Sequence, residues 1–255
     1  MSFRPERFLY WHTLDPAVQR AIEELILRFQ PYSREGLSNN WDYGLTVDEQ
    51  WQLKHHSMWE LPDQLVLNAS SDAALLYDTE YDFKYFLPRL LLQALRDETL
   101  AQVLSSARMV NIMSWPEAER EAIKVLLQAW WTQCLKQRVD FNSWPAEDAL
   151  CAIALLGLDL SPLLDEWETN PGLNASLHLI ETIRLLFIGH KDALLLEGYW
   201  EHCPAQAEQV QTWLLGTEVL EKVQKVPGAL QWVSREGERQ LLEETVQRLV
   251  KARRR

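Results

Sequence analysis

The sequence predicts an all-α protein, either a multi-helix bundle or a short α-α solenoid of roughly nine to eleven helices. Apolar residues recur at the spacing of one helix face along most of the chain. Evidence for strands is thin, because residues 65–67 form the only tempting run and no Asn-Gly or Asp-Gly hairpin turn occurs. The 255 residues are 47% hydrophobic and 24% charged, a globular mixture that excludes disorder of the whole chain.

The first two helices are marked by their caps. Asp15 and Pro16 supply an N-cap and a proline at the first helical position, and Pro31 is expected to end that helix. Thr46 and Glu49 form a capping-box pattern that opens a second helix. This second helix would stop at Pro62 and align Val47, Trp51, His55, Met58 and Trp59 on one face.

A third helix is expected to start at Leu87-Pro88, because a proline in the first turn loses no helical hydrogen bond. The residue before a proline favours extended backbone, so residues 77–86 are expected to be an extended or tightly turning lead-in. In an extended chain, Asp78, Glu80 and Asp82 would share one face.

Two helix starts resemble each other. Residues 114–119 and 143–148 each offer a serine cap, an early proline and acidic residues in the first turn, and they lie 29 residues apart. The first helix would continue to Leu135 and the second to Gly157. The spacing fits either a helical repeat or two independent helix caps.

Four further helices are expected in the last third of the chain. One spans 176–188, Pro204 opens the next, a short helix precedes Pro227-Gly228, and the last begins at about residue 236. No Gly/Ser linker divides the chain, so we expect a single domain over 1–255, with a weak subdivision near 108–114 at most.

Charge is concentrated in one stretch. Residues 35–83 hold ten acidic residues, one lysine and no arginine, a net charge of −9 out of −12 for the chain. Such a chain repels phosphate, and no basic stripe overrides that repulsion, so we expect neither nucleic acid nor membrane as a partner. Carboxylates interleaved with aromatic rings favour a basic protein partner.

The candidate partner-binding residues are acids and aromatic residues of this stretch. They are Asp78, Glu80, Tyr81, Asp82, Trp41, Tyr43, Trp51 and Trp59. Clustered carboxylates repel one another until a cation relieves the repulsion, and Trp and Tyr are common interface anchors. The alternative is a solvated loop whose acids contact Lys84 and Arg89.

No motif identifies a reaction, and we predict no catalytic residue, no metal ligand and no cofactor. Adjacent His55 and His56 would point about 100° apart on a helix, so they suit a helix surface better than one metal ion. Three cysteines without paired spacing indicate free, mostly buried thiols in a reducing compartment. With no signal-type segment and no long apolar run, we expect a cytoplasmic protein.

Residues 82–91, Asp-Phe-Lys-Tyr-Phe-Leu-Pro-Arg-Leu-Leu, follow acidic residues and precede a leucine-rich helix. This block resembles small bacterial cytosolic all-helical proteins, some of the type that gives immunity to polymorphic toxins. The resemblance covers about ten residues. It implies an all-helical fold and an inhibitory role, and no functional residue carries over.

Three functional hypotheses follow. The favoured one is a protein-binding inhibitor, an immunity protein that neutralises a basic bacterial toxin domain by occluding its active site. The second is an enzyme with a helical cleft that uses acidic residues of 35–83. The third is a helical-repeat scaffold.

Overall fold

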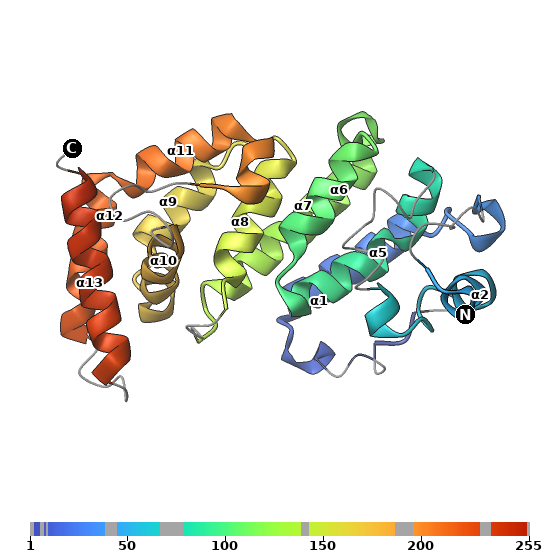
Figure 1. The fold of residues 1–255 in the computed structure, drawn as a ribbon, viewed down its shortest axis with the longest axis horizontal. Coiled ribbons are helices and arrows are strands. Elements are labelled where there is room, and N and C mark those ends of the chain that lie inside the picture. Colours follow the sequence, from blue (N-terminus) through green and yellow to red (C-terminus); the bar gives the residue numbers. More distant parts are fainter. Residues whose placement is uncertain are drawn as a thin grey trace. The chain divides into compact units, whose positions relative to one another are not determined.

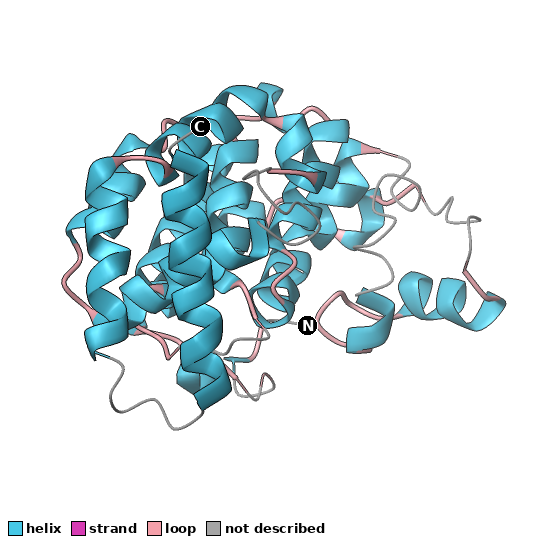
Figure 2. Cartoon of the chain, turned by 60° about the vertical axis from the view of Figure 1, so that its left-hand side comes forward, coloured by secondary structure: helices cyan, strands magenta, loops and turns pink. Residues whose placement is uncertain are grey.

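The computed structural model describes residues 3–5, 8, 10–38, 45–66, 79–138, 143–186, 196–229 and 236–253. Within these ranges every regular element is a helix, so the all-α prediction is confirmed (Figure 2). Residues 65 and 66, from the tempting strand run, are helical. In the described ranges, no helix combines the length and the apolar character needed to cross a membrane.

The chain divides into two compact units, Met1–Gln133 and Cys134–Arg255. The weak boundary expected near 108–114 falls inside the first unit, where it covers the end of helix α6 (Leu100–Met109) and the short 3-10 helix Ile112–Ser114. That the whole chain is one domain stays a prediction.

The first unit is built around helix α5 (Figure 1). Its helices are α1 (Pro16–Phe29), α2 (Val47–His55), α5 (Glu80–Asp97), α6 (Leu100–Met109) and α7 (Glu117–Cys134). Helix α5 contacts α1, α6 and the 3-10 helix η3 (Arg34–Gly36). The apolar faces of α1 and α5 supply fully buried residues such as Ile22, Leu25, Phe83 and Leu87, and burying such faces stabilises the fold.

The first two helices begin at the predicted positions, and of their N-cap residues Thr46 forms a side-chain cap whereas Asp15 does not. Helix α1 begins at Pro16 after Asp15 and ends at Phe29, before Pro31. In α2, the Thr46 side chain accepts a hydrogen bond from the Glu49 backbone, and the Glu49 carboxylate accepts one from the Thr46 backbone at 2.8 Å. This is the expected capping box.

The predicted alignment of five residues on one face of α2 is wrong. The helix ends at His55, so Met58, Trp59 and Pro62 lie beyond it. Val47 is 85% exposed, and the buried residue of α2 is Leu53. The spacing rule failed because it was extended through residues that leave the helix.

The predicted start of the third helix is also wrong. Helix α5 begins at Glu80, where the Thr79 side chain accepts a hydrogen bond from the Asp82 backbone. Pro88 therefore lies inside the helix, where a proline costs about 3 kcal/mol. Phe83, Phe86 and Leu87 are all buried, and their burial offsets that cost.

Ser114 and Ser143 were expected to cap two later helices, but neither is the N-cap residue of its helix. The Ser114 hydroxyl donates to the Asn111 carbonyl at 2.9 Å, and α7 begins at Glu117. The N-cap of α8 (Pro145–Leu155) is Trp144 rather than Ser143. In α7, Trp130 and Trp131 are both buried.

The second unit packs around helix α10, which contacts α8, α9, α12 and α13. Its helices are α8 (Pro145–Leu155), α9 (Ser161–Thr169), α10 (Leu173–Leu186), α11 (Pro204–Leu214), α12 (Thr217–Ala229) and α13 (Glu236–Arg253). Gly157 has a φ of 68°, the left-handed conformation that suits glycine after a helix end.

The predicted starts at Pro204 and near residue 236 are confirmed. Two other expectations fail. Helix α10 begins at Leu173, before the predicted position 176, and α12 runs past Pro227-Gly228 to Ala229. Helix α9 was not predicted.

Candidate functional site

The first turns of α5 use their polar groups inside the protein. The Asp82 carboxylate is fully buried and accepts a hydrogen bond from the Ser38 backbone at 3.0 Å and another from the Ser38 hydroxyl. The Tyr81 hydroxyl accepts from the Ser33 N–H at 2.8 Å and donates to the Ser33 carbonyl at 3.2 Å. These bonds hold residues 33–38 against the start of α5.

Lys84 is a buried cation with two carboxylate partners. Its amine lies 2.9 Å from Glu119 and 2.7 Å from Glu80, and 4.6 Å from the centre of the Trp115 ring. Burial by itself would lower the pKa of this amine, but hydrogen bonds to Glu80 and Glu119 outweigh burial and raise that pKa. Lys84 therefore stays charged and ties α5 to α7.

A groove of about 740 Å³ lies beside this network. It runs between one face of α1, residues 32–35 and the turn at 57–59, with Tyr85 of α5 at its base. The Tyr85 hydroxyl accepts a hydrogen bond from the Met58 backbone at 3.3 Å, as Tyr81 does from Ser33. Two tyrosines of one helix thus fix two walls of the groove.

Large apolar side chains make much of the groove surface. Trp59 is half-buried, and its ring centre lies 4.9 Å from that of Phe3. Leu27 is 63% exposed on the α1 side, and Phe29 and Tyr85 lie deeper. Such a surface suits an aromatic or aliphatic anchor from another molecule.

The edges of the groove carry charge. Glu23 and Glu35 are exposed and line it, together with Arg34. The Arg34 guanidinium donates to the carbonyls of Lys54 and, at 3.0 Å, of His55. Hydrogen bonds from Ser33 and from its own backbone lower the pKa of Glu35, so this carboxylate is ionised at neutral pH.

The predicted common face of Asp78, Glu80 and Asp82 is wrong in its geometry. Residues two apart on a helix point about 160° apart. Glu80 is accordingly exposed and paired with Lys84, while Asp82 points inward. Asp78, Trp41 and Tyr43 lie outside the described residues.

The two described tryptophans of the predicted set have different surroundings. Trp51 is 51% exposed and stacks on His55, with ring centres 4.6 Å apart. Trp59 lines the groove. That these residues bind a partner stays a prediction.

Other acids of the 35–83 stretch are engaged locally. Glu60 accepts from the Ser57 backbone and hydroxyl at 3.2 and 3.0 Å. Asp63 pairs with Arg89 and, at 2.5 Å, with Arg96. The local alternative, in which acids of this stretch contact cations of the chain itself, thus holds for Asp63 and Glu80.

The described residues contain no group of three or more His, Cys, Asp or Glu side chains that could hold a metal ion. Cys134, Cys151 and Cys203 are buried thiols that form no disulfide, as predicted. A hydrogen bond with Cys203 and burial raise the pKa of Cys151, so this thiol is protonated at neutral pH.

The sequence argument missed Glu23, Leu27 and Tyr85. The buried positions of α1 follow one face of the helix, and Leu27 lies off that face and is exposed. A leucine outside the apolar face was the sequence signal that could have pointed to this groove. Comparison of the chain with family models, with curated proteins and with solved structures finds no match.

Proposed function

We propose that this protein is a protein-binding inhibitor that holds a basic partner in the groove of its first unit and occludes the partner's active site. Immunity proteins neutralise toxin domains in this way, and a basic toxin domain is the partner we propose. The groove lined by Trp59, Leu27 and Tyr85 is the observation on which the proposal depends.

The surroundings of the groove support this assignment. Glu23 and Glu35 place negative charge beside an apolar surface, which suits a segment with a hydrophobic anchor next to lysine or arginine. The net charge of −12 favours encounter with a basic protein. Hydrogen bonds from α5 hold Ser33 and Met58 in place, which limits the ordering cost of binding.

The test is a pull-down from the native host with the wild-type protein as bait, followed by mass spectrometry and by titration of the recovered partner. Trp59→Ala removes the anchor ring, and Leu27→Lys places a cation at an exposed position of the groove. Each should weaken binding by about 30-fold, the equivalent of about 2 kcal/mol at an interface hot spot.

Met109→Ala is the matched control, because Met109 is 73% exposed and does not line the groove. It should bind as the wild type does. Recovery of a basic protein whose affinity is the same for wild type, Trp59→Ala and Leu27→Lys would refute the groove as the binding site. Recovery of an acidic partner alone would refute the proposed partner class.

A further inference from the structure

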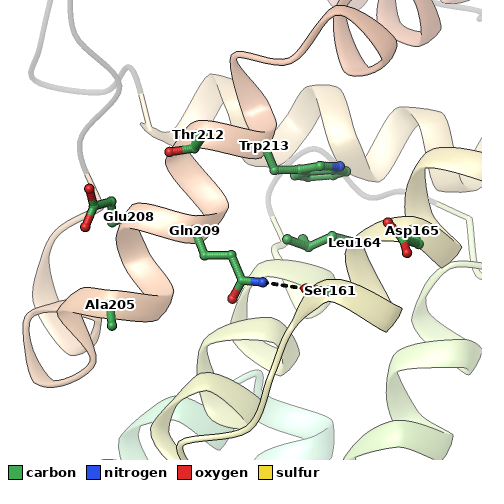
Figure 3. A pocket seen from close by; sticks show the side chains of 8 residues that line it. All are labelled: Ser161, Leu164, Asp165, Ala205, Glu208, Gln209, Thr212 and Trp213. Atoms are coloured by element: carbon green, nitrogen blue, oxygen red, sulfur yellow. Dashed lines mark hydrogen bonds between the residues drawn. The ribbon is translucent and has the colours of Figure 1, made fainter.

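Helix α11 faces α9 in the second unit across a groove of about 500 Å³ (Figure 3). Gln209 of α11 bridges this groove, because its side-chain amide donates to the Ser161 hydroxyl at 2.9 Å, the bond drawn in Figure 3. The same amide donates to the Asp159 carboxylate at 3.2 Å. Near the end of α11, the Trp213 indole N–H donates to the Glu168 carboxylate at 3.0 Å. These bonds fix α11 along one of its sides.

The start of α11 is also tied to α8. The 3-10 helix η5 (Gly198–His202) precedes α11 and contacts both α8 and α11. The buried Trp200 of η5 donates its indole N–H to the Glu147 carboxylate of α8 at 2.6 Å. The Cys203 backbone N–H donates to the Trp200 carbonyl at 3.0 Å. Together these bonds place Cys203, the N-cap residue of α11, beside α8.

Two buried thiols meet at this contact. Glu147 and Cys151 are four residues apart, so they lie on the same face of α8. Trp200 binds the first of these two positions, and at the second the Cys151 and Cys203 thiols are hydrogen-bonded to each other. Both side chains are at most 3% exposed. The Cys203 thiol also lies 3.9 Å from the carbonyl of Tyr199, whose side chain is 40% exposed, so the pair lies close to the surface.

We infer that Cys151 and Cys203 form an oxidation site, at which a peroxide converts the two thiols into a disulfide that links α8 to the start of α11. Two sulfur atoms that already share a hydrogen bond need only a small movement to reach bonding distance. The bonds of Trp200 and Gln209 hold both sides of the link in place beforehand. This site goes beyond the proposed inhibitor role and does not involve the groove of the first unit.

The reaction balances with hydrogen peroxide as the oxidant. One thiol attacks a peroxide oxygen, the O–O bond breaks, and a sulfenic acid and water form. The second thiol attacks the sulfenic sulfur, the S–S bond forms, and the oxygen leaves as a second water. The peroxide takes up two electrons, and both thiol protons end in water. The hydrogen bond with Cys203 and burial raise the pKa of Cys151, and the thiolate is the reactive form, so the folded protein should react slowly.

The test uses the intact, reduced protein treated with hydrogen peroxide, then unfolded, alkylated with N-ethylmaleimide and mapped by mass spectrometry. Of the three cysteines, Cys134 should remain alkylated, and a linked peptide pair should contain Cys151 and Cys203. The melting temperature should rise by about 5–10 °C, because the new disulfide restricts the unfolded chain. Dithiothreitol should reverse both changes.

Cys134→Ala is the matched control, because Cys134 is another buried thiol of the second unit. It should give the same linked peptides and the same rise in melting temperature. Cys151→Ala and Cys203→Ala should give neither. Circular dichroism of the reduced variants verifies that they fold, and the wild-type peptide map tests the pairing without any variant.

A wild-type protein that keeps all three thiols after prolonged treatment would overturn the inference. So would a disulfide that includes Cys134 or joins two molecules, or oxidation of Cys151 or Cys203 to a sulfinic acid without a disulfide. Trp59→Ala and Leu27→Lys, which alter the first groove, should form the link as the wild type does. The two proposals therefore fail separately.

Discussion

At the scale of single residues, the acidic stretch shows why a count of charges does not define a binding surface. Glu49 closes a capping box, Glu60 accepts from Ser57, and Asp82 is buried under Ser38. Each of these carboxylates satisfies backbone or side-chain donors of its own chain. These hydrogen bonds leave the carboxylates charged but fix where they point, and Asp82 points into the protein. Fewer acidic side chains can therefore reach a partner than the composition suggests, and Glu35, which lines the groove, is one that can.

Asp63 is an acid of this stretch that pairs with two arginines of the chain itself. Its carboxylate joins Arg96 to Arg89, which is buried and lies 5.0 Å from the Phe8 ring centre. Burial would raise the pKa of Asp63, but Arg96 and Arg89 outweigh it and hold that pKa below its ordinary value. The stabilisation is therefore complete above the unfolded-state pKa and is lost as pH falls through the folded-state pKa.

Asp63→Asn should lower the free energy of unfolding by about 1–2 kcal/mol at about pH 7, less than for a fully buried pair because the Asp63 side chain is half exposed. Urea unfolding followed by tryptophan fluorescence measures this. The difference from wild type should shrink toward about pH 3. Glu24→Gln, which breaks an exposed pair with Arg28, should cost little at either pH. A pH-independent difference for Asp63→Asn would contradict the assignment.

At the scale of elements, sequence patterns located helices better than they located helix faces. Pro16 and Thr46 gave correct starts because a proline at the first helical position and a capping box both act within one turn. The start of α5 was misjudged because Pro88 was given more weight than the apolar spacing before it. The end of α2 at His55 was missed because Pro62 was expected to stop the helix, and the chain leaves the helix before that proline.

The contact between η3 and α5 gives an element-scale prediction. A Cβ at Gly36 would overlap the Tyr81 ring, so Gly36→Ala should displace that ring and break its hydrogen bonds to Ser33. We expect a loss of about 1–2 kcal/mol in the free energy of unfolding, measured by urea denaturation. In a Tyr81→Ala background the space is empty, so Gly36→Ala should then cost little. An equal cost in both backgrounds would refute the steric explanation.

At the scale of the whole molecule, the all-α class followed from periodicity and the near absence of strand signals, but neither groove could be predicted. The first depends on α1 lying near residues 57–59, and the second on α9 lying near α11. Such pairings join segments far apart in sequence, and one-dimensional patterns carry no information on them. Trp59, predicted as a partner-binding residue because of its type, lines the first groove, and that it binds a partner stays a prediction.

The division into two units yields the last prediction. The contacts that shape the first groove, from Tyr81 to Ser33, Tyr85 to Met58 and Lys84 to Glu119, all lie within the first unit. Gln133 accepts from the Asp15 backbone at 2.8 Å, so the end of α7 belongs to the same set of contacts. A fragment of residues 1–138 should therefore fold alone, with a helical circular dichroism spectrum and a cooperative thermal transition.

A shorter fragment, residues 1–115, is the matched control for that experiment. This fragment lacks α7 and therefore Glu119, so the Lys84 amine loses its buried carboxylate partner. Removing one partner of a buried pair costs about 3–5 kcal/mol. It also uncovers apolar surface that Ile123 and Leu126 bury. The shorter fragment should therefore lack a cooperative transition. If the two fragments behave alike, the contacts of α7 do not define the first unit, and the boundary at residues 133–134 is not a folding boundary.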